Sequence, residues 1–267
     1  MASNPSVNLI AAQRITVKAA RAAGRLMYAN WHRSKRVKLA EAHDIKLELD
    51  VRCQKLITRI LRDAFPDIPL LGEEGDSGDV NAQYRWVVDP IDGTVNYFLG
   101  MPHAAVSIAL QVQGPKSKVQ SHQTVLGVIY SPFTDELWTA VRGGPARLNG
   151  RIIRVSQRSR LEEAVIAVGF SKSQENLEKS LPVLVRLARR ARKIRIMGSA
   201  ALELAYVASG RLDAYIERTI NLWDIAAGGL IVESAGGRFW TQPIPPTKKL
   251  RLVASNGCIH SRLPIPK

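Results

Sequence analysis

Hydrophobic residues recur at helical spacing in two stretches before residue 66. The first stretch runs to about residue 32, and Asn4 followed by Pro5 is typical of a helix start. The second stretch begins at Asp50 and ends at Phe65, so Asp50 lies near the start of its helix, where a carboxylate complements the helix dipole. We therefore predict two amphipathic helices in this part of the chain.

The middle of the chain carries a strand pattern instead. The apolar run Tyr84–Val88 predicts a strand, and the pair Asn149-Gly150 predicts a hairpin turn. Further strands are predicted at residues 106–112, 125–130 and 137–141. This antiparallel meander leads us to expect one domain over residues 1–267, with an N-terminal lobe of about 1–150 and a C-terminal lobe of about 151–267.

Short strands and helices alternate in the predicted C-terminal lobe. The strands are expected at residues 164–168, 195–197, 214–217 and 253–254, and the helices at 174–191, 198–208 and 225–234. The helix over 174–191 should turn six apolar residues inward: Leu177, Leu181, Leu184, Leu187, Ala188 and Ala191. The basic residues Arg186, Arg189, Arg190 and Lys193 would then form its outer face.

Composition indicates a globular protein, because 46% of the 267 residues are hydrophobic and 23% are charged. Two cysteines, Cys53 and Cys258, form neither a disulfide framework nor a metal-binding spacing, which favours the reducing cytoplasm. The N-terminus lacks the order of a signal peptide. The apolar run Ile225–Val232 is too short to span a bilayer, so we expect no membrane insertion.

The net charge of +15 and the pI near 10.2 favour acidic partners. Phosphorylated substrates, nucleic acid and an anionic surface all fit, and so does a basic face that is merely solvated. The cluster from Arg186 to Arg195 is the best nucleic-acid candidate. No aromatic residues interleave with it, so the stacking surfaces typical of single-stranded binding are missing.

The stretch Asp89-Pro90-Ile91-Asp92-Gly93-Thr94 directly follows the predicted strand Tyr84–Val88. Two carboxylates at a strand end suit a hard divalent cation, and free N–H groups at a following helix start suit a phosphate. An ordinary turn is the alternative, since Asp, Pro and Gly are common turn residues. Upstream, Gly72-Glu73-Glu74-Gly75 adds two glutamates that would otherwise suggest a solvated loop.

Taken with Asp50 and Glu73, two motifs resemble the signatures of the inositol monophosphatase family of magnesium-dependent, lithium-sensitive phosphatases. The first motif is Asp89 to Thr94, and the second is Trp223 to Gly228 followed by Glu233 to Gly237. The resemblance covers about residues 5–258. It implies an α+β fold, a five-layer αβαβα sandwich, and a homodimer.

The resemblance also implies the roles of the site residues. Mg²⁺, as two to three ions per subunit, would be held by Glu73, Asp89, the Ile91 carbonyl, Asp92 and Asp224. Asp50, Glu73 and Thr94 would be catalytic, with Asp50 and Thr94 orienting the attacking water. Substrate would contact Asp92, Gly93, Thr94, Gly198, Ser199, Ala200 and Glu217. The acids would repel one another without cations, which predicts strict dependence on a divalent ion and weak activity at acid pH.

Some positions depart from the family pattern. Lys46-Leu47 replaces the usual Val-Thr pair, Val95 replaces a second Thr, and Asn221 stands where some relatives carry His. Lys38 is one residue out of register with a lysine that the family often carries. We expect the Asn221 difference to bear on substrate choice, and the Lys46-Leu47 difference on the local hairpin geometry.

These observations predict a Mg²⁺-dependent phosphatase that acts on a small phosphorylated polyol or sugar. Myo-inositol monophosphate is the expected substrate, hydrolysed by in-line attack of a metal-activated water. Alternatives within the class are 3′-phosphoadenosine and fructose bisphosphate. An alternative of another class is a protein that binds nucleic acid or the transcription machinery on the same fold. The sequence itself does not rank the phosphate monoesters or give the isomer preference.

Overall fold

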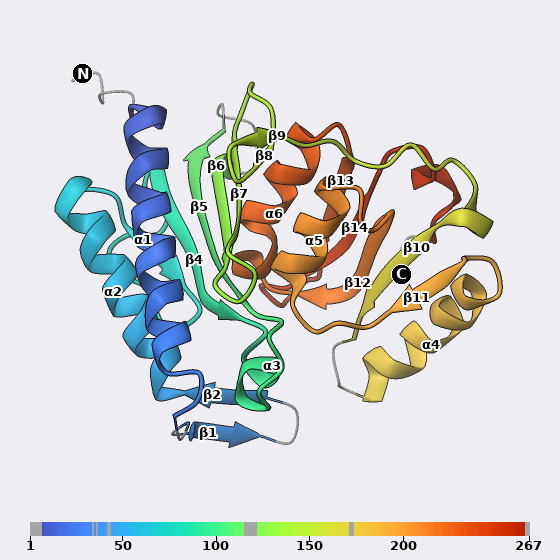
Figure 1. Cartoon of the computed structure of the whole chain (residues 1–267), viewed down its shortest axis with the longest axis horizontal. Helices are drawn as coiled ribbons and strands as arrows, with labels where there is room; N and C mark the ends of the chain where they lie inside the picture. The colour runs from blue at the N-terminus through green and yellow to red at the C-terminus, as the bar shows by residue number, and fades with distance from the viewer. Residues whose placement is uncertain are drawn as a thin grey trace.

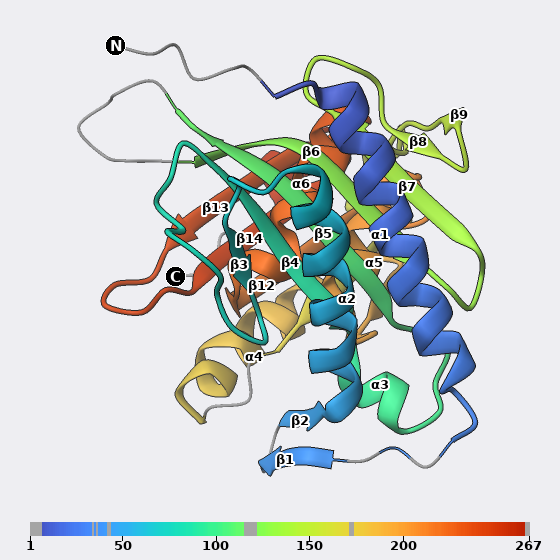
Figure 2. The same cartoon turned by 90° about the vertical axis from the view of Figure 1, so that its left-hand side faces the viewer.

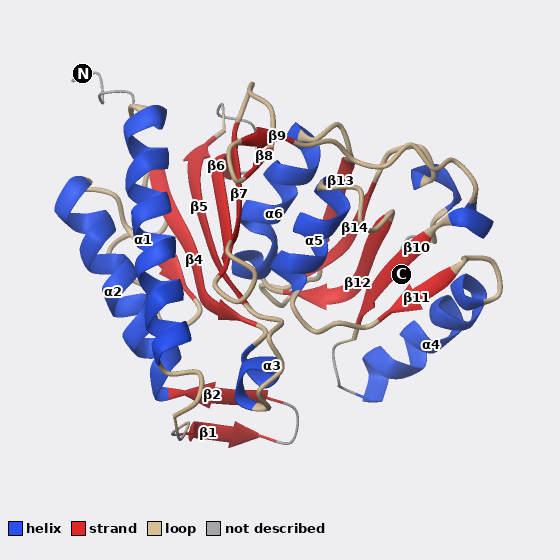
Figure 3. Cartoon of the chain, in the orientation of Figure 1, coloured by secondary structure: helices blue, strands red, loops and turns tan. Residues whose placement is uncertain are grey.

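Two β-sheets alternate with three layers of helices in the computed structural model of the chain (Figures 1 and 3). The structure describes residues 7–33, 35, 37–41, 44–114, 122–170 and 174–264. From one side to the other the layers are α1 with α2, the first sheet, α5 with α6, the second sheet, and α4. This order is the expected five-layer αβαβα sandwich of the α+β class.

The first sheet has seven strands in the order β3-β4-β5-β6-β7-β8-β9. Its strands are β3 (Leu70–Gly72), β4 (Tyr84–Asp92), β5 (Ala105–Gln113), β6 (His122–Ser131), β7 (Glu136–Val141), β8 (Arg147–Leu148) and β9 (Arg151–Ile152). Only the β3–β4 pair is parallel, so the predicted antiparallel meander is confirmed. Strand β4 is longer than predicted and continues to Asp92. The division into two lobes near residue 150 stays a prediction.

Helices α1 (Leu9–Ala29) and α2 (Glu48–Ala64) lie side by side across the outer face of this sheet (Figure 2). Asn8 caps α1, because its side-chain oxygen accepts from the N–H groups of Ile10 at 3.0 Å and Ala11 at 3.1 Å. The described helix thus begins at Leu9, and the residues of the predicted start, Asn4 and Pro5, lie outside the described part of the chain.

A short hairpin joins these two helices. It consists of β1 (Val37–Glu41) and β2 (Asp44–Leu47), which pair antiparallel and lie near the short helix α3 (Thr94–Phe98) (Figure 1). Leu47, one of the two residues that replace the family's usual Val-Thr pair, is buried and immediately precedes α2. The side chains of Lys38 and Lys46 lie outside the described part.

The central layer is made of α5 (Ala200–Ala208) and α6 (Leu222–Ser234). Every residue from Ile225 to Val232 is buried, because α6 is covered by the first sheet, by α5 and by the second sheet. A helix that is apolar all round is expected in such a position. The apolar run Ile225–Val232 is thus part of a core helix. No helix in the described ranges has the length and apolar character needed to cross a membrane.

The second sheet has five strands in the order β11-β10-β12-β14-β13. They are β10 (Val165–Gly169), β11 (Lys193–Arg195), β12 (Ala214–Ile220), β13 (Arg238–Pro243) and β14 (Leu250–Ser255). Strand β11 lies two residues earlier than predicted, and β13 was not predicted. Strand β13 is a half-exposed edge strand that begins just after Gly236-Gly237, so its alternation is weak.

Helix α4 (Gln174–Ala188) covers the outer face of the second sheet, but with only some of the predicted side chains. Leu177 and Leu181 are 37% and 49% exposed, and Ala188 is also exposed. The inward positions Leu184 and Leu187 are confirmed, and Ser180 and Val183 lie beside them in place of Leu177 and Leu181. The four inward residues follow i, i+3, i+4, i+7 spacing, so the stripe that contacts the sheet is narrower and rotated relative to the prediction.

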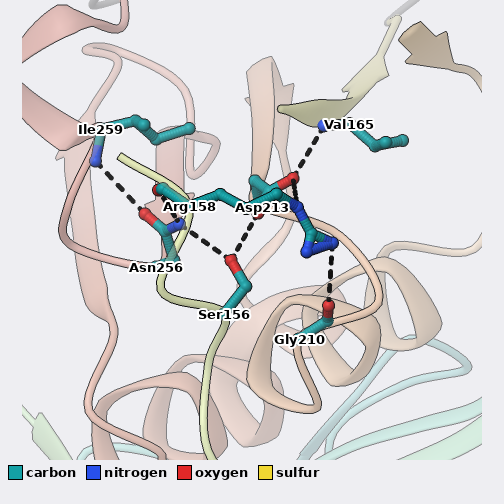
Figure 4. Close-up of polar contacts among 7 residues, drawn as sticks. All are labelled: Ser156, Arg158, Val165, Gly210, Asp213, Asn256 and Ile259. Atoms are coloured by element: carbon teal, nitrogen blue, oxygen red, sulfur yellow. Dashed lines mark hydrogen bonds and ion pairs between the residues drawn. The ribbon is translucent and has the colours of Figure 1, made fainter. Parts of the chain in front are cut away.

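A buried aspartate joins the second sheet to the segment that enters it (Figure 4). The carboxylate of Asp213 is fully buried and accepts from the Val165 N–H at 2.7 Å, from the Ser156 hydroxyl and from Arg158 Nε at 3.3 Å. Asn256 donates to Ser156 Oγ at 2.9 Å and thereby adds the end of β14 to the network. These contacts hold the segment after β9 against the starts of β10 and β12.

Candidate active site

A cavity of about 680 Å³ opens at the ends of β4 and β12, beside the start of α5. The structure brings nearly all predicted site residues to its wall: Glu73, Asp89, Ile91, Asp92, Gly93, Thr94, Gly198, Ser199, Ala200, Glu217 and Asp224. Val95 and Asn221, which depart from the family pattern, also line it. Segments far apart in the sequence therefore meet at one polar cavity.

Three aspartates form the acidic centre of the cavity. One carboxylate oxygen from each of Asp89, Asp92 and Asp224 lies within 4.8 Å of those of the other two. Asp89 and Asp92 are 2% and 7% exposed at the end of β4, where the pairing with β5 shifts register between them. The Ile91 N–H donates to Asp89 Oδ1 at 3.0 Å, which fixes the orientation of that carboxylate.

Burial and mutual repulsion disfavour negative charge on this centre. Desolvation raises the pKa of Asp89 well above its ordinary value, and the charges of Glu73, Asp92 and Asp224 raise it further. The pKa of Asp224 is raised for the same two reasons. Three converging carboxylates, joined by no Cys or His ligand from the described residues, are the donor set that Mg²⁺ prefers. The residues present therefore fit a hard divalent cation.

Asp92 is held by the start of α5. Its carboxylate accepts hydrogen bonds from the Ser199 hydroxyl, from the Ala201 N–H at 2.9 Å and from the Ala200 N–H at 3.3 Å. Burial raises the pKa of Asp92 to about 6, although these hydrogen bonds oppose the rise. The short segment at residues 199–201 thus orients one acid of the centre and joins the central helical layer to β4.

Gly93 and Thr94 turn the chain from β4 into α3. Gly93 has a φ of 90°, and a Cβ atom there would lie 2.8 Å from the His103 carbonyl oxygen, so only glycine fits without strain. The Thr94 hydroxyl donates to the Ile91 carbonyl oxygen at 2.9 Å. That carbonyl keeps a second lone pair. Its predicted role as a metal ligand is therefore compatible with this hydrogen bond.

Glu73 approaches the same centre from the loop after β3. Its N–H donates to the Val88 carbonyl oxygen at 3.2 Å, and its side chain hydrogen-bonds to Asp89. Asp50 differs from the other predicted residues, because it does not line the cavity. It is 3% exposed in the first turn of α2, where its Oδ2 accepts from the Leu47 N–H at 2.6 Å. Its catalytic role stays a prediction.

The sequence reasoning missed Glu203, Tyr215 and Lys249, which also line the cavity. The Tyr215 hydroxyl donates to Glu217, and Glu203 Oε1 accepts from the Met197 N–H at 3.0 Å. Burial raises the pKa of Glu203 to about 8 and that of Glu217 to about 7. The i, i+2 spacing of Tyr215 and Glu217 on one strand was the available signal for Tyr215.

The chain matches the model of the inositol monophosphatase family over residues 10–262. It is 41% identical to the Nus factor SuhB of Xylella fastidiosa, over 87% of this chain and 80% of that protein. It is 36% identical to the fructose-1,6-bisphosphatase/inositol-1-monophosphatase of Thermotoga maritima, over 93% and 92% of the two chains. The crystal structure of extragenic suppressor protein suhB from Bartonella henselae superposes with a TM-score of 0.86 at 37% identity, covering 94% of this chain and 96% of that one.

Proposed function

The chain belongs to the inositol monophosphatase family, and from this premise we propose that it is a Mg²⁺-dependent phosphatase acting on a small phosphate monoester. The observation that carries the proposal is the convergence of Asp89, Asp92 and Asp224, with Glu73 beside them, on the wall of one polar cavity. Such a centre is costly to build from buried acids unless a cation occupies it.

In this proposal Glu73, Asp89, Asp92, Asp224 and the Ile91 carbonyl hold the Mg²⁺ ions. The chemistry that bound Mg²⁺ supplies is charge neutralisation at the phosphate oxygens and activation of water. Ser199 and the backbone of α5 keep Asp92 in place through the hydrogen bonds described above.

Gly93, Thr94 and the segment Gly198 to Ala200 would contact the substrate phosphate. Asp50 would act with Thr94 on the attacking water, although it is not among the residues that line the cavity. The Thr94 hydroxyl would then exchange its hydrogen bond to the Ile91 carbonyl for one to water.

The rest of the cavity favours a neutral, hydroxyl-rich group on the substrate, and we propose myo-inositol monophosphate. Glu217, with Tyr215 behind it, offers a hydrogen-bond acceptor to a ring hydroxyl. Among the described lining residues, Lys249 is the one basic side chain, whereas Glu203 and Glu217 are acidic. A second phosphate would therefore face buried carboxyl groups. Fructose bisphosphate and 3′-phosphoadenosine are the alternative substrates. Fructose bisphosphate is supported by the name of the Thermotoga relative, which includes fructose-1,6-bisphosphatase.

A phosphate-release assay tests this function. We expect release from myo-inositol 1-phosphate with Mg²⁺, slower release from fructose 1,6-bisphosphate and 3′-phosphoadenosine, and none in excess chelator. Asp92→Asn should lower kcat/KM by about 100-fold or more, since it removes a ligand oxygen from the centre. Asp63→Asn, at an exposed position on α2, is the matched control. Undiminished turnover in chelator would overturn the metal assignment.

Binding to nucleic acid or the transcription machinery is a second candidate function. The observation that favours it is the similarity to a protein called Nus factor SuhB, together with the exposed Arg186 of α4 and the exposed Arg189 and Arg190 that directly follow this helix. In this case Asp92→Asn should leave binding to RNA unchanged, whereas Arg189→Gln with Arg190→Gln should weaken it and flatten its salt dependence. RNA retention that disappears at moderate salt and does not respond to these arginines would remove this candidate.

The homodimer, the lithium sensitivity and the cytoplasmic location belong to the same proposal. Sedimentation equilibrium would test the first, and inhibition of phosphate release by Li⁺ would test the second.

A further inference from the structure

The side chain of Gln54 binds the loop that carries Glu73. Gln54 is 7% exposed on α2, and its amide is used on both sides. Its Nε2 donates to the Gly75 carbonyl oxygen at 2.8 Å, and its Oε1 accepts from the Glu74 N–H at 3.0 Å. One side chain therefore satisfies a backbone donor and a backbone acceptor immediately after Glu73.

The contact is close as well as polar. A Cβ atom on Gly72 would lie 2.4 Å from Gln54 Oε1 and 2.7 Å from its Nε2, so the amide packs directly against the Gly72 backbone. The Gly75 N–H donates to the Gly72 carbonyl oxygen at 3.2 Å and closes a turn over Glu73 and Glu74. Gln54 thus stabilises a defined turn conformation and not merely a loop position.

Glu73 is held from two directions as a result. On one side its N–H is bonded to the Val88 carbonyl oxygen of β4, one residue before Asp89. On the other side the turn is bonded to Gln54 on α2, one helical turn after Asp50. Loss of the second anchor would leave the Glu73 carboxylate free to move relative to Asp89.

We propose that Gln54 is a positioning residue, which holds the Glu73 carboxylate beside Asp89 and thereby sets the affinity of the acidic centre for divalent cations. The inference rests on the proposed function only for the identity of the cation. Residues behind metal ligands commonly change metal affinity by about 10- to 100-fold when they are altered. The hydrogen bonds of Gln54 go to the backbone of Glu74 and Gly75, and none of those described goes to the three aspartates. Any effect of Gln54 on the acidic centre therefore passes through the Glu73 turn.

Three variants separate this role from a general loss of stability. Q54L keeps the bulk of the side chain and removes both hydrogen bonds. Q54E keeps the acceptor for the Glu74 N–H and loses the donor to the Gly75 carbonyl. Q111L is the matched control: Gln111 is 4% exposed in β5 and hydrogen-bonds to Arg85 and Thr124, away from the cavity.

Cation binding is measured by calorimetric titration with Mg²⁺ and Mn²⁺, and by the rise in Tm that each ion produces over the chelator-treated protein. We expect Q54L to bind the ions about 10- to 100-fold more weakly, with Q54E between Q54L and the unaltered chain. In the phosphate-release assay the Mg²⁺ midpoint should rise in the same order, while kcat at saturating Mg²⁺ changes less than about threefold. Q111L should lower Tm in chelator and leave the cation affinity unchanged.

A loss of cation affinity below fivefold in Q54L, or an equal loss in Q111L, would overturn the inference. If Q54L does not fold, the comparison of Q54E with Q111L decides. Because cation affinity is measured without substrate, the test does not depend on which phosphate ester is hydrolysed. Cation binding that follows the expected order without any phosphate release would contradict the proposed function and leave the role of Gln54 intact.

Discussion

At the scale of single residues, the candidate site is defined by carboxyl groups that are buried before any ligand arrives. Asp89 and Asp92 are nearly inaccessible at the end of β4, and Glu203 is 1% exposed in the cavity wall. A buried carboxyl group holds its proton to higher pH than an exposed one, because charging it in the protein interior is costly. The pH dependence of stability should report these groups directly.

Glu203 gives the clearest residue-level prediction. Its pKa is raised from 4.5 to about 8 in the folded chain, so the unfolded chain releases this proton first as the pH rises. Between about pH 4.5 and pH 8 the folded state binds more protons, and the free energy of unfolding therefore falls with increasing pH. Glu203→Gln cannot ionise and should remove on the order of 3 kcal/mol of this fall, since one pKa unit is worth about 1.4 kcal/mol.

Urea unfolding in chelator at pH 5.5 and pH 8 measures this difference. The metal-site acids contribute a pH slope of their own, so the comparison between the unaltered chain and Glu203→Gln is the relevant quantity. Glu162→Gln, at an exposed position, serves as the control. Parallel pH profiles for the unaltered chain and Glu203→Gln would show that the Glu203 carboxyl is ionised in the folded protein.

At the scale of elements, the contacts between segments are made by few side chains. The single carboxylate of Asp213 accepts hydrogen bonds from Ser156, Arg158 and Val165. It thereby connects the segment after β9 to two strands of the second sheet. The helix α5 similarly meets β4 through the hydrogen bonds from its first residues to Asp92. Removing such a group leaves several buried partners unsatisfied at once.

We predict that Asp213→Ala lowers the free energy of unfolding by about 3–5 kcal/mol, because it takes a fully buried acceptor away from the Ser156 hydroxyl, the Val165 N–H group and the Arg158 guanidinium. Glu175→Ala removes an ion pair to Lys179 that is exposed on α4, and should cost much less, because water screens an exposed pair. Urea unfolding of both variants checks the contrast. Equal losses would mean that the Asp213 network adds no more stability than a surface pair.

At the scale of the whole molecule, a strongly basic surface surrounds an acidic cavity. The chain carries a net charge of +15, whereas the described cavity wall contains several carboxyl groups and one lysine. A positive overall field raises the rate at which anionic ligands arrive, and this effect is weakened by salt. The same field attracts nucleic acid, so charge alone supports both candidate functions.

We expect kcat/KM for a phosphate monoester to fall several-fold, about 3- to 10-fold, between 20 mM and 300 mM ionic strength at saturating Mg²⁺. The value of kcat should change little, because salt acts on the encounter with the substrate. Initial rates in NaCl and in KCl separate this effect from binding of a particular ion. A salt-independent kcat/KM would show that the basic surface does not steer the substrate.

Hydrophobic patterns in the sequence predicted the helices and strands whose burial follows their own periodicity. The helical stripe before residue 66, the strand run Tyr84–Val88 and the meander after it all reflect periodicity that matches the observed burial. The inward face of α4 was only partly right: Leu184 and Leu187 are covered, whereas Leu177 and Leu181 are exposed, because the orientation of a helix depends on the sheet that it contacts. Edge strand β13 was missed for a related reason: it is only half covered.

The sequence by itself determined the family, the five-layer fold through that resemblance, and the acids of the candidate centre, because two motifs and Glu73 specify them residue by residue. Only the tertiary structure decided which groups share the cavity and how they are held. It left Asp50 out of the cavity lining, brought Glu203 and Tyr215 to Glu217, and set Gln54 against the Glu73 turn. Such neighbours lie on different elements, and hydrogen-bond geometry and burial arise only when the layers pack together.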